Sequence, residues 1–152
     1  MVGDIEKTLD KARSTCDDMG LKLTTKRCRV LQILLQAKEP LSAYHIIDHY
    51  RLSFSETLPA MSAYRMLRFL LQAGLIHKLE TTHQYVACTH IACGHTHQAP
   101  HFLICDRCHQ VKELRISRGL LDELEINIDK SGFSTTDSQL EWHGVCQACL
   151  IT

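Results

Sequence analysis

Two cysteine pairs of identical spacing constrain this chain more than any other feature. They are Cys105-Asp-Arg-Cys108 and Cys146-Gln-Ala-Cys149. Each Cys-x-x-Cys can aim two sulfurs at one point, and two pairs complete the tetrahedral thiolate set of a structural Zn²⁺ site, with no position left open for catalysis. Because 37 residues separate the pairs, too many for a small zinc finger, we expect strands and a helix between them.

Two other interpretations of these cysteines are a pair of disulfides and a pair of redox centres. A redox Cys-x-x-Cys usually follows the first strand of a βαβ pattern, and neither pair lies there. The chain has eight cysteines and shows neither a signal peptide nor an apolar run of about 20 residues. We therefore expect a cytoplasmic protein with no membrane association, whose thiolates are kept for metal.

The two halves of the sequence differ in charge and in metal-binding residues. Residues 1–86 hold 12 Lys and Arg against 9 Asp and Glu, whereas residues 87–152 hold 5 against 8, and six of the eight cysteines follow position 87. A basic half followed by an acidic, metal-rich half favours two domains with separate roles. We predict a first domain at 1–88, a linker rich in His and Cys at 89–100, and a zinc-clamped second domain at 101–152.

The first half has the pattern of a winged helix-turn-helix. Apolar residues at helical spacing predict a helix over residues 4–19, a second capped by Thr24 or Thr25, a third capped by Ser42 and a fourth over residues 60–73. Two short strands around a polar turn follow, over residues 75–88. In such a module the last helix enters the major groove, while the wing and earlier helix ends touch phosphates.

Arg65 and Tyr64 lie early in the expected recognition helix. An arginine there suits guanine O6 and N7, and a tyrosine can reach a phosphate or a thymine methyl group. Lys22 and Arg51 are phosphate neutralisers or ordinary surface charges, and the sequence does not separate these two roles. The predicted DNA-contacting residues are Tyr64, Arg65, Tyr44, Arg27, Lys26 and Arg68.

The second half predicts a small ββαβ unit, so the chain as a whole is expected to be α+β. The strands are expected at 101–105, 110–116 and 133–143, with a helix at 118–130. So small a core needs the zinc clamp and a partner subunit, and we expect a homodimer. The helix residues expected inside are Leu120, Leu121, Leu124 and Ile128.

The segment between the halves is a second candidate for metal binding. Thiolate and imidazole concentrated in a short tract form a zinc-selecting ligand set. The residues concerned are His90, Cys93, His95, His97 and His101.

The sequence resembles the ferric uptake regulator superfamily of bacterial metal-sensing repressors over essentially its whole length. Within this family it is most similar to the zinc uptake regulators, through Ile76-His-Lys78, Tyr85-Val-x-Cys88 and the segment from Ile104 to Glu113. The family motifs are Leu23-Thr-Thr-Lys-Arg27 with Val30-Leu31, Leu41-Ser-Ala-Tyr44, Tyr64-Arg65-x-Leu67-x-x-Leu70-x-x-x-Gly74-Leu75, Ile104-Cys-Asp-Arg-Cys108 and Gly144-Val-Cys-Gln-Ala-Cys149.

This resemblance implies a homodimer with a second, regulatory zinc site at the hinge, and hence two Zn²⁺ per chain. Its ligands would be His77, Cys88, a linker histidine (His97, with His95 in reserve) and Glu113. Cys88 favours zinc, since a purely oxygen and nitrogen set suits iron or manganese better. The chain departs from the pattern at Met61-Ser-Ala63, at Pro100-His101 and at Cys93, which has no counterpart.

The expected function is a zinc-responsive repressor of zinc-uptake genes that binds a palindromic, AT-rich operator as a zinc-loaded dimer. A family member that senses iron, manganese or peroxide is one alternative, and a zinc store or chaperone is another. No small organic ligand is expected. An enzyme is disfavoured because a hydrolytic zinc site needs an open coordination position, and the deaminase signature is absent.

Overall fold

The computed structural model describes residues 2–91, 99–136 and 139–152. The chain divides into two compact units, Met1–Thr96 and His97–Thr152, and the division lies inside the predicted linker. None of the described helices is long and apolar enough to cross a membrane.

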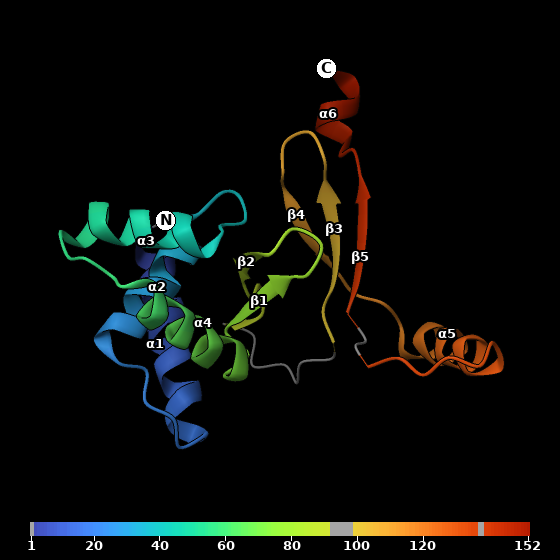
Figure 1. Ribbon diagram of the computed structural model, residues 1–152, viewed down its shortest axis with the longest axis horizontal. Helices are drawn as coiled ribbons and strands as arrows, with labels where there is room; N and C mark the ends of the chain where they lie inside the picture. Colours follow the sequence, from blue (N-terminus) through green and yellow to red (C-terminus); the bar gives the residue numbers. More distant parts are fainter. Residues whose placement is uncertain (1, 92–98, 137–138) are drawn as a thin grey trace. The chain divides into compact units, whose positions relative to one another are not determined.

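In the part of the chain that the structure describes, the first unit has four helices followed by a β-hairpin (Figure 1). The helices are α1 (Val2–Asp18), α2 (Thr25–Gln36), α3 (Ala43–Phe54) and α4 (Ala60–Gln72), and the strands are β1 (Ile76–Leu79) and β2 (Gln84–Ala87). This is the element order that the sequence predicts for a winged helix-turn-helix.

Local capping explains where these helices begin and end. The Thr24 side chain accepts a hydrogen bond from the backbone N–H of Arg27 at the start of α2, and Ser42 does the same for His45 at the start of α3. Gly20 and Gly74 follow α1 and α4 with φ of 70°, a left-handed conformation that glycine adopts without steric cost.

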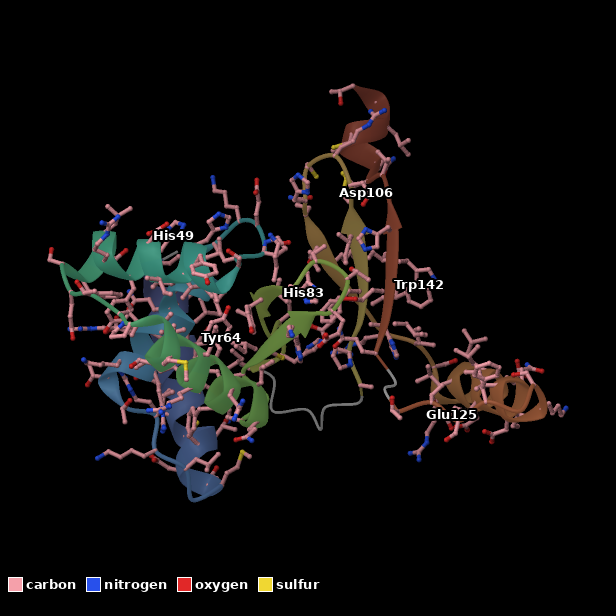
Figure 2. All side chains as sticks on the ribbon, viewed as in Figure 1. His49, Tyr64, His83, Asp106, Glu125 and Trp142 are labelled. Atoms are coloured by element: carbon pink, nitrogen blue, oxygen red, sulfur yellow. The ribbon has the colours of Figure 1, made fainter. Side chains whose placement is uncertain are left out.

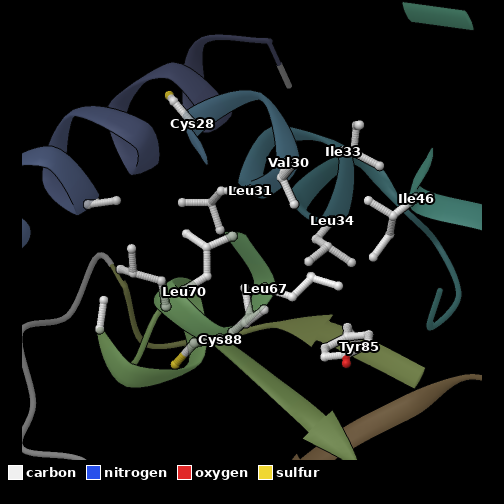
Figure 3. Packing of buried hydrophobic residues seen from close by; sticks show 14 of the residues in the cluster. Cys28, Val30, Leu31, Ile33, Leu34, Ile46, Leu67, Leu70, Tyr85 and Cys88 are labelled. Atoms are coloured by element: carbon white, nitrogen blue, oxygen red, sulfur yellow. The ribbon is translucent and has the colours of Figure 1, made fainter. Parts of the chain in front are cut away.

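The core of the first unit lies where α2, α3 and α4 meet (Figure 3). Leu67 and Leu70 of α4 are buried against Leu31 and Leu34 of α2 and Ile46 of α3. Burial of a leucine side chain contributes about 1.5–3 kcal/mol, so this apolar stripe fixes which face of α4 points outward.

The hairpin is attached to the helices by backbone pairing. Tyr85 N donates to Leu41 O at 2.8 Å and Leu41 N donates to Tyr85 O at 3.1 Å, so the residue before the α3 cap joins the edge of β2. The β1–β2 register pairs His77 with Val86. This anchoring fixes the wing relative to α3.

The second unit contains a three-stranded sheet with the order β4-β3-β5. Its elements are β3 (His101–Cys105), β4 (Val111–Leu114), α5 (Arg118–Lys130), β5 (Leu140–Gly144) and the short α6 (Gln147–Ile151). β4 is antiparallel to β3 and β5 is parallel to it, and α5 lies in the connection between β4 and β5. The third strand is shorter than the predicted 133–143.

Helix α5 differs from the sequence prediction in its packing. Its bounds agree with the predicted 118–130, but it buries none of its residues, and Leu120 and Leu124 are 58% and 40% exposed. The expectation that Leu120, Leu121, Leu124 and Ile128 lie inside is therefore wrong for a single chain. Periodicity shows that a helix has an apolar face, but not which surface covers it.

Candidate metal centres and DNA-binding surface

The four predicted cysteines form one thiolate cluster inside the second unit. The sulfurs of Cys105, Cys108, Cys146 and Cys149 all lie within 4.8 Å of one another, and those of Cys108 and Cys146 are 3.7 Å apart. A tetrahedral Zn²⁺ with Zn–S bonds of about 2.3 Å has S–S edges of about 3.8 Å. The cluster therefore fits a four-coordinate zinc ion, and its donor set is the one zinc takes in structural sites.

The register of the sheet explains why two distant cysteine pairs meet. Cys105 ends β3 opposite Gly144 of β5, two residues before Cys146, and Asp106 N donates to Gly144 O at 2.8 Å. The turn that carries Cys108 closes through His109, which has φ of 59° and donates its N–H to Cys105 O at 2.9 Å. Parallel strands end at the same edge, so both pairs reach it together.

Hydrogen bonding within the cluster gives its thiols different pKa values. Hydrogen bonds from the backbone N–H groups of Cys108 and Cys146 lower the pKa of Cys105 to about 6. The Cys146 nitrogen lies 3.3 Å from the Cys105 sulfur. The thiols of Cys146 and Cys108 raise the pKa of Cys149 to about 12. A divalent cation would remove this conflict, because it favours every thiolate at once.

His77 and Cys88 lie together on one face of the wing. His77 pairs with Val86 across the hairpin, and Cys88 lies two residues farther along, so its side chain points to the same face. Cys88 N donates to Leu75 O at 3.0 Å, and the ligand atoms of His77 and Cys88 are within 4.8 Å. The backbone N–H of His90 donates to the Cys88 sulfur at 3.4 Å.

The remaining residues of the predicted regulatory site are not brought together by either unit alone. Glu113 is half-buried on β4 of the second unit, whereas His97 and the reserve His95 lie outside the described residues, as does Cys93. His101 starts β3 with its side chain buried, where its Nδ1 accepts a hydrogen bond from Leu140 N at 3.3 Å. Burial lowers the pKa of His101, which favours its neutral form.

Four of the predicted DNA-contacting residues project from the exposed side of α3 and α4. They are Tyr44, Tyr64, Arg65 and Arg68, and Figure 2 shows Tyr64 on α4. Tyr64, Arg65 and Arg68 lie on α4 opposite its buried leucines, so they form a polar surface about one turn long.

Lys26 and Arg27, the other two predicted contacts, already have partners within the unit. The Arg27 guanidinium lies 3.7 Å from the centre of the Phe69 ring and donates to Lys22 O at 2.8 Å. Lys26 Nζ is 2.7 Å from a carboxylate oxygen of Glu56. Hydrogen bonding to Glu56 raises the pKa of Lys26, and the same contact lowers the pKa of Glu56.

Two further ion pairs could not be found from the sequence. Glu56 also binds Arg29, at 2.9 Å, and His143 Nδ1 lies 2.7 Å from Asp106 Oδ1 beside the thiolate cluster. The paired residues are 27 and 37 positions apart, where no local spacing signals a contact. The one hint in the sequence is the position of Glu56 just before α4.

A family comparison agrees with this architecture. The model of the ferric uptake regulator family matches residues 18–143. The chain belongs to the ferric uptake regulator family. The resemblance drawn from the sequence is thus confirmed, and with it the α+β class.

The family members most similar to this chain include zinc regulators. The zinc uptake regulation protein of Escherichia coli (strain K12) is 35% identical over 145 residues, 95% of this chain and 82% of that protein. A zinc uptake regulator solved in complex with zinc and DNA matches with a TM-score of 0.85 at 31% identity, over 97% of this chain and 95% of that one. Holo XcZur matches with a TM-score of 0.80 at 34% identity, over 95% and 97%.

Proposed function

We propose that this chain is a zinc-responsive transcriptional repressor of zinc-uptake genes, active in the cytoplasm as a homodimer. The observation that carries the proposal is the Cys88 thiol beside His77 on the wing of a DNA-binding fold. Thiolate with imidazole selects zinc over the iron and manganese that oxygen-rich sites favour. The similarity to regulators named for zinc uptake supports the same metal.

Each chain is proposed to hold two zinc ions in different roles. Cys105, Cys108, Cys146 and Cys149 would hold one permanently, because four thiolates leave no coordination position open. His77, Cys88, His97 (or His95) and Glu113 would hold the second. These ligands come from both domains and the linker, so occupancy of this site is able to favour one arrangement of the chain over others.

The proposed switch is a population shift between arrangements of the two domains. His77 and Cys88 from the wing would join Glu113 from β4 around one ion, and this closed arrangement would bind metal more tightly than open ones. Closure would set the spacing of the two α4 helices of a dimer to fit successive major grooves of a palindromic, AT-rich operator.

The proposed dimer interface includes α5 of the second unit. Its exposed Leu120 and Leu124, together with Leu140 and Trp142, line a hollow of about 290 Å³. An isolated helix of 13 residues is marginal in water. A symmetric partner would cover this face and supply the core that the small unit lacks.

Operator binding at buffered free zinc tests the proposal. Fluorescence anisotropy on AT-rich palindromic duplexes should show tight binding only above a threshold of free zinc, with two zinc ions per chain by elemental analysis. Iron and manganese at matched free concentrations serve as controls. Equal activation by either metal would favour the iron or manganese alternative, and no DNA binding at low salt would favour a zinc store or chaperone.

A further inference from the structure

Glu56 holds two cations of α2 with one carboxylate. It lies in the loop between α3 and α4, and its two oxygens are 2.7 Å from Lys26 Nζ and 2.9 Å from an Arg29 guanidinium nitrogen. The loop leads directly into the proposed recognition helix. The carboxylate therefore lies beside the proposed DNA-binding surface. This position is unexpected, because a negative charge repels the phosphate backbone of DNA.

The two cations differ in how they are held. Arg29 also lies 4.7 Å from the centre of the Phe54 ring and 3.4 Å from the Tyr50 hydroxyl, and its side chain is 33% exposed. The Lys26 side chain is 54% exposed, and Glu56 is its ion-pair partner among the described residues. Loss of the Glu56 charge would thus release Lys26 but leave Arg29 packed against the aromatic rings.

Lys26 also lines a cleft at the proposed DNA-binding surface. The cleft has a volume of about 510 Å³ and lies between the start of α2 and the first turns of α4. Arg27 and Arg65 contribute further positive charge, and Thr24, Thr25 and Ser62 contribute hydroxyl groups. Cations and hydroxyls of this kind are the groups that contact DNA phosphates.

We propose that Glu56 competes with DNA phosphate for Lys26 and so sets the background affinity of the protein for DNA of any sequence. The inference rests on the proposed DNA-binding function and adds a residue that regulates it. While Lys26 is paired with Glu56, it adds no net attraction for the phosphate backbone. Base reading by Arg65 should be unaffected, because the two carboxylate oxygens of Glu56 bind Lys26 and Arg29.

The test uses zinc-loaded full-length protein and a mixed-sequence 30-base-pair duplex, with affinity measured by anisotropy from 50 to 200 mM salt. Glu56→Gln keeps the side-chain shape and removes the charge. Its affinity should rise about threefold to tenfold, and the slope of log K against log salt should become steeper by about 0.9, the effect of one added phosphate contact. The double variant Lys26→Met/Glu56→Gln should return to wild-type behaviour.

Several outcomes would overturn the inference. An unchanged slope for Glu56→Gln would do so, as would a double variant that keeps the raised affinity. If the wild type binds no DNA at low salt, the proposed function fails as well. If the wild type binds DNA and Glu56→Gln has the same affinity and salt slope, this inference fails but the proposed function stands.

A measurement on the wild type avoids dependence on the folding of any variant. Lys26 should be acetylated more slowly than Lys38, an exposed lysine without an ion pair in the described chain, as followed by peptide mass spectrometry. Equal rates for the two lysines would contradict the pairing with Glu56.

Discussion

The two groups of candidate metal ligands differ in how many of their residues belong to one folded unit. The thiolate cluster lies wholly within the second unit, where sheet register and backbone hydrogen bonds bring all four sulfurs together. Among the described residues of the first unit, the wing contributes His77 and Cys88. A complete site stabilises the unit that contains it. An incomplete site must recruit ligands from elsewhere, and that recruitment is what a switch requires.

The largest expected effect comes from breaking the complete site. Cys108→Ser should remove the structural zinc, whose binding contributes on the order of 10 kcal/mol in small zinc domains. The second unit should lose cooperative unfolding and the dimer should dissociate, as measured by calorimetry and analytical ultracentrifugation. His143→Asn, which alters a neighbour of the cluster without removing a sulfur, should keep its zinc. A stable dimeric Cys108→Ser protein would contradict the structural role.

Breaking the wing pair should change regulation but not folding. Cys88→Ser should keep one zinc per chain and a folded dimer, and should lose about 5-fold to 150-fold in zinc-dependent operator affinity, the usual range of an allosteric coupling. The matched control is His83→Asn in the wing turn, where φ of 53° suits asparagine. If Cys88→Ser retained full zinc-dependent binding and two zinc ions, the switch mechanism would be wrong.

A change on α4 should leave both clusters intact. Arg65→Lys should lose the bidentate geometry that reads guanine. The difference in binding free energy between the operator and an operator with the contacted guanine replaced should shrink by about 1–3 kcal/mol. Zinc content should stay at the wild-type value. Arg118→Lys in α5 is the control, and equal losses in the two variants would exclude base reading by Arg65.

The smallest effect concerns the protons released when zinc enters the thiolate cluster. The pKa of Cys105 is about 6 and that of Cys149 about 12, so at pH 7 Cys105 is mostly ionised while Cys149 must lose its proton to bind. Zinc binding should release fewer than four protons per cluster at pH 7. As the pH falls through about 6, Cys105 becomes protonated, and the number of protons released should rise by about one. Calorimetry in buffers of different ionisation enthalpy measures this number, and four protons at pH 7 would contradict the lowered pKa of Cys105.

Sequence reasoning located the helices well because their signals are local. The caps at Thr24 and Ser42 and the apolar spacing of α4 lie within a few residues of the features they predict. The same reasoning failed for the surroundings of α5, since periodicity identifies an apolar face without its partner. It also missed Glu56, whose contacts with α2 depend on the path of a loop.

The sequence by itself identified the four candidate thiolate ligands, because two Cys-x-x-Cys pairs of equal spacing match a four-thiolate zinc site. It also identified the helices of the first unit and the family. Only the tertiary structure decided which side chains meet across long separations. The β1–β2 register puts His77 and Cys88 on one face, and the loop before α4 brings Glu56 to Lys26. The physical reason is that residue spacing sets local geometry, whereas strand register and loop path, which follow from packing of the whole unit, set contacts between distant residues.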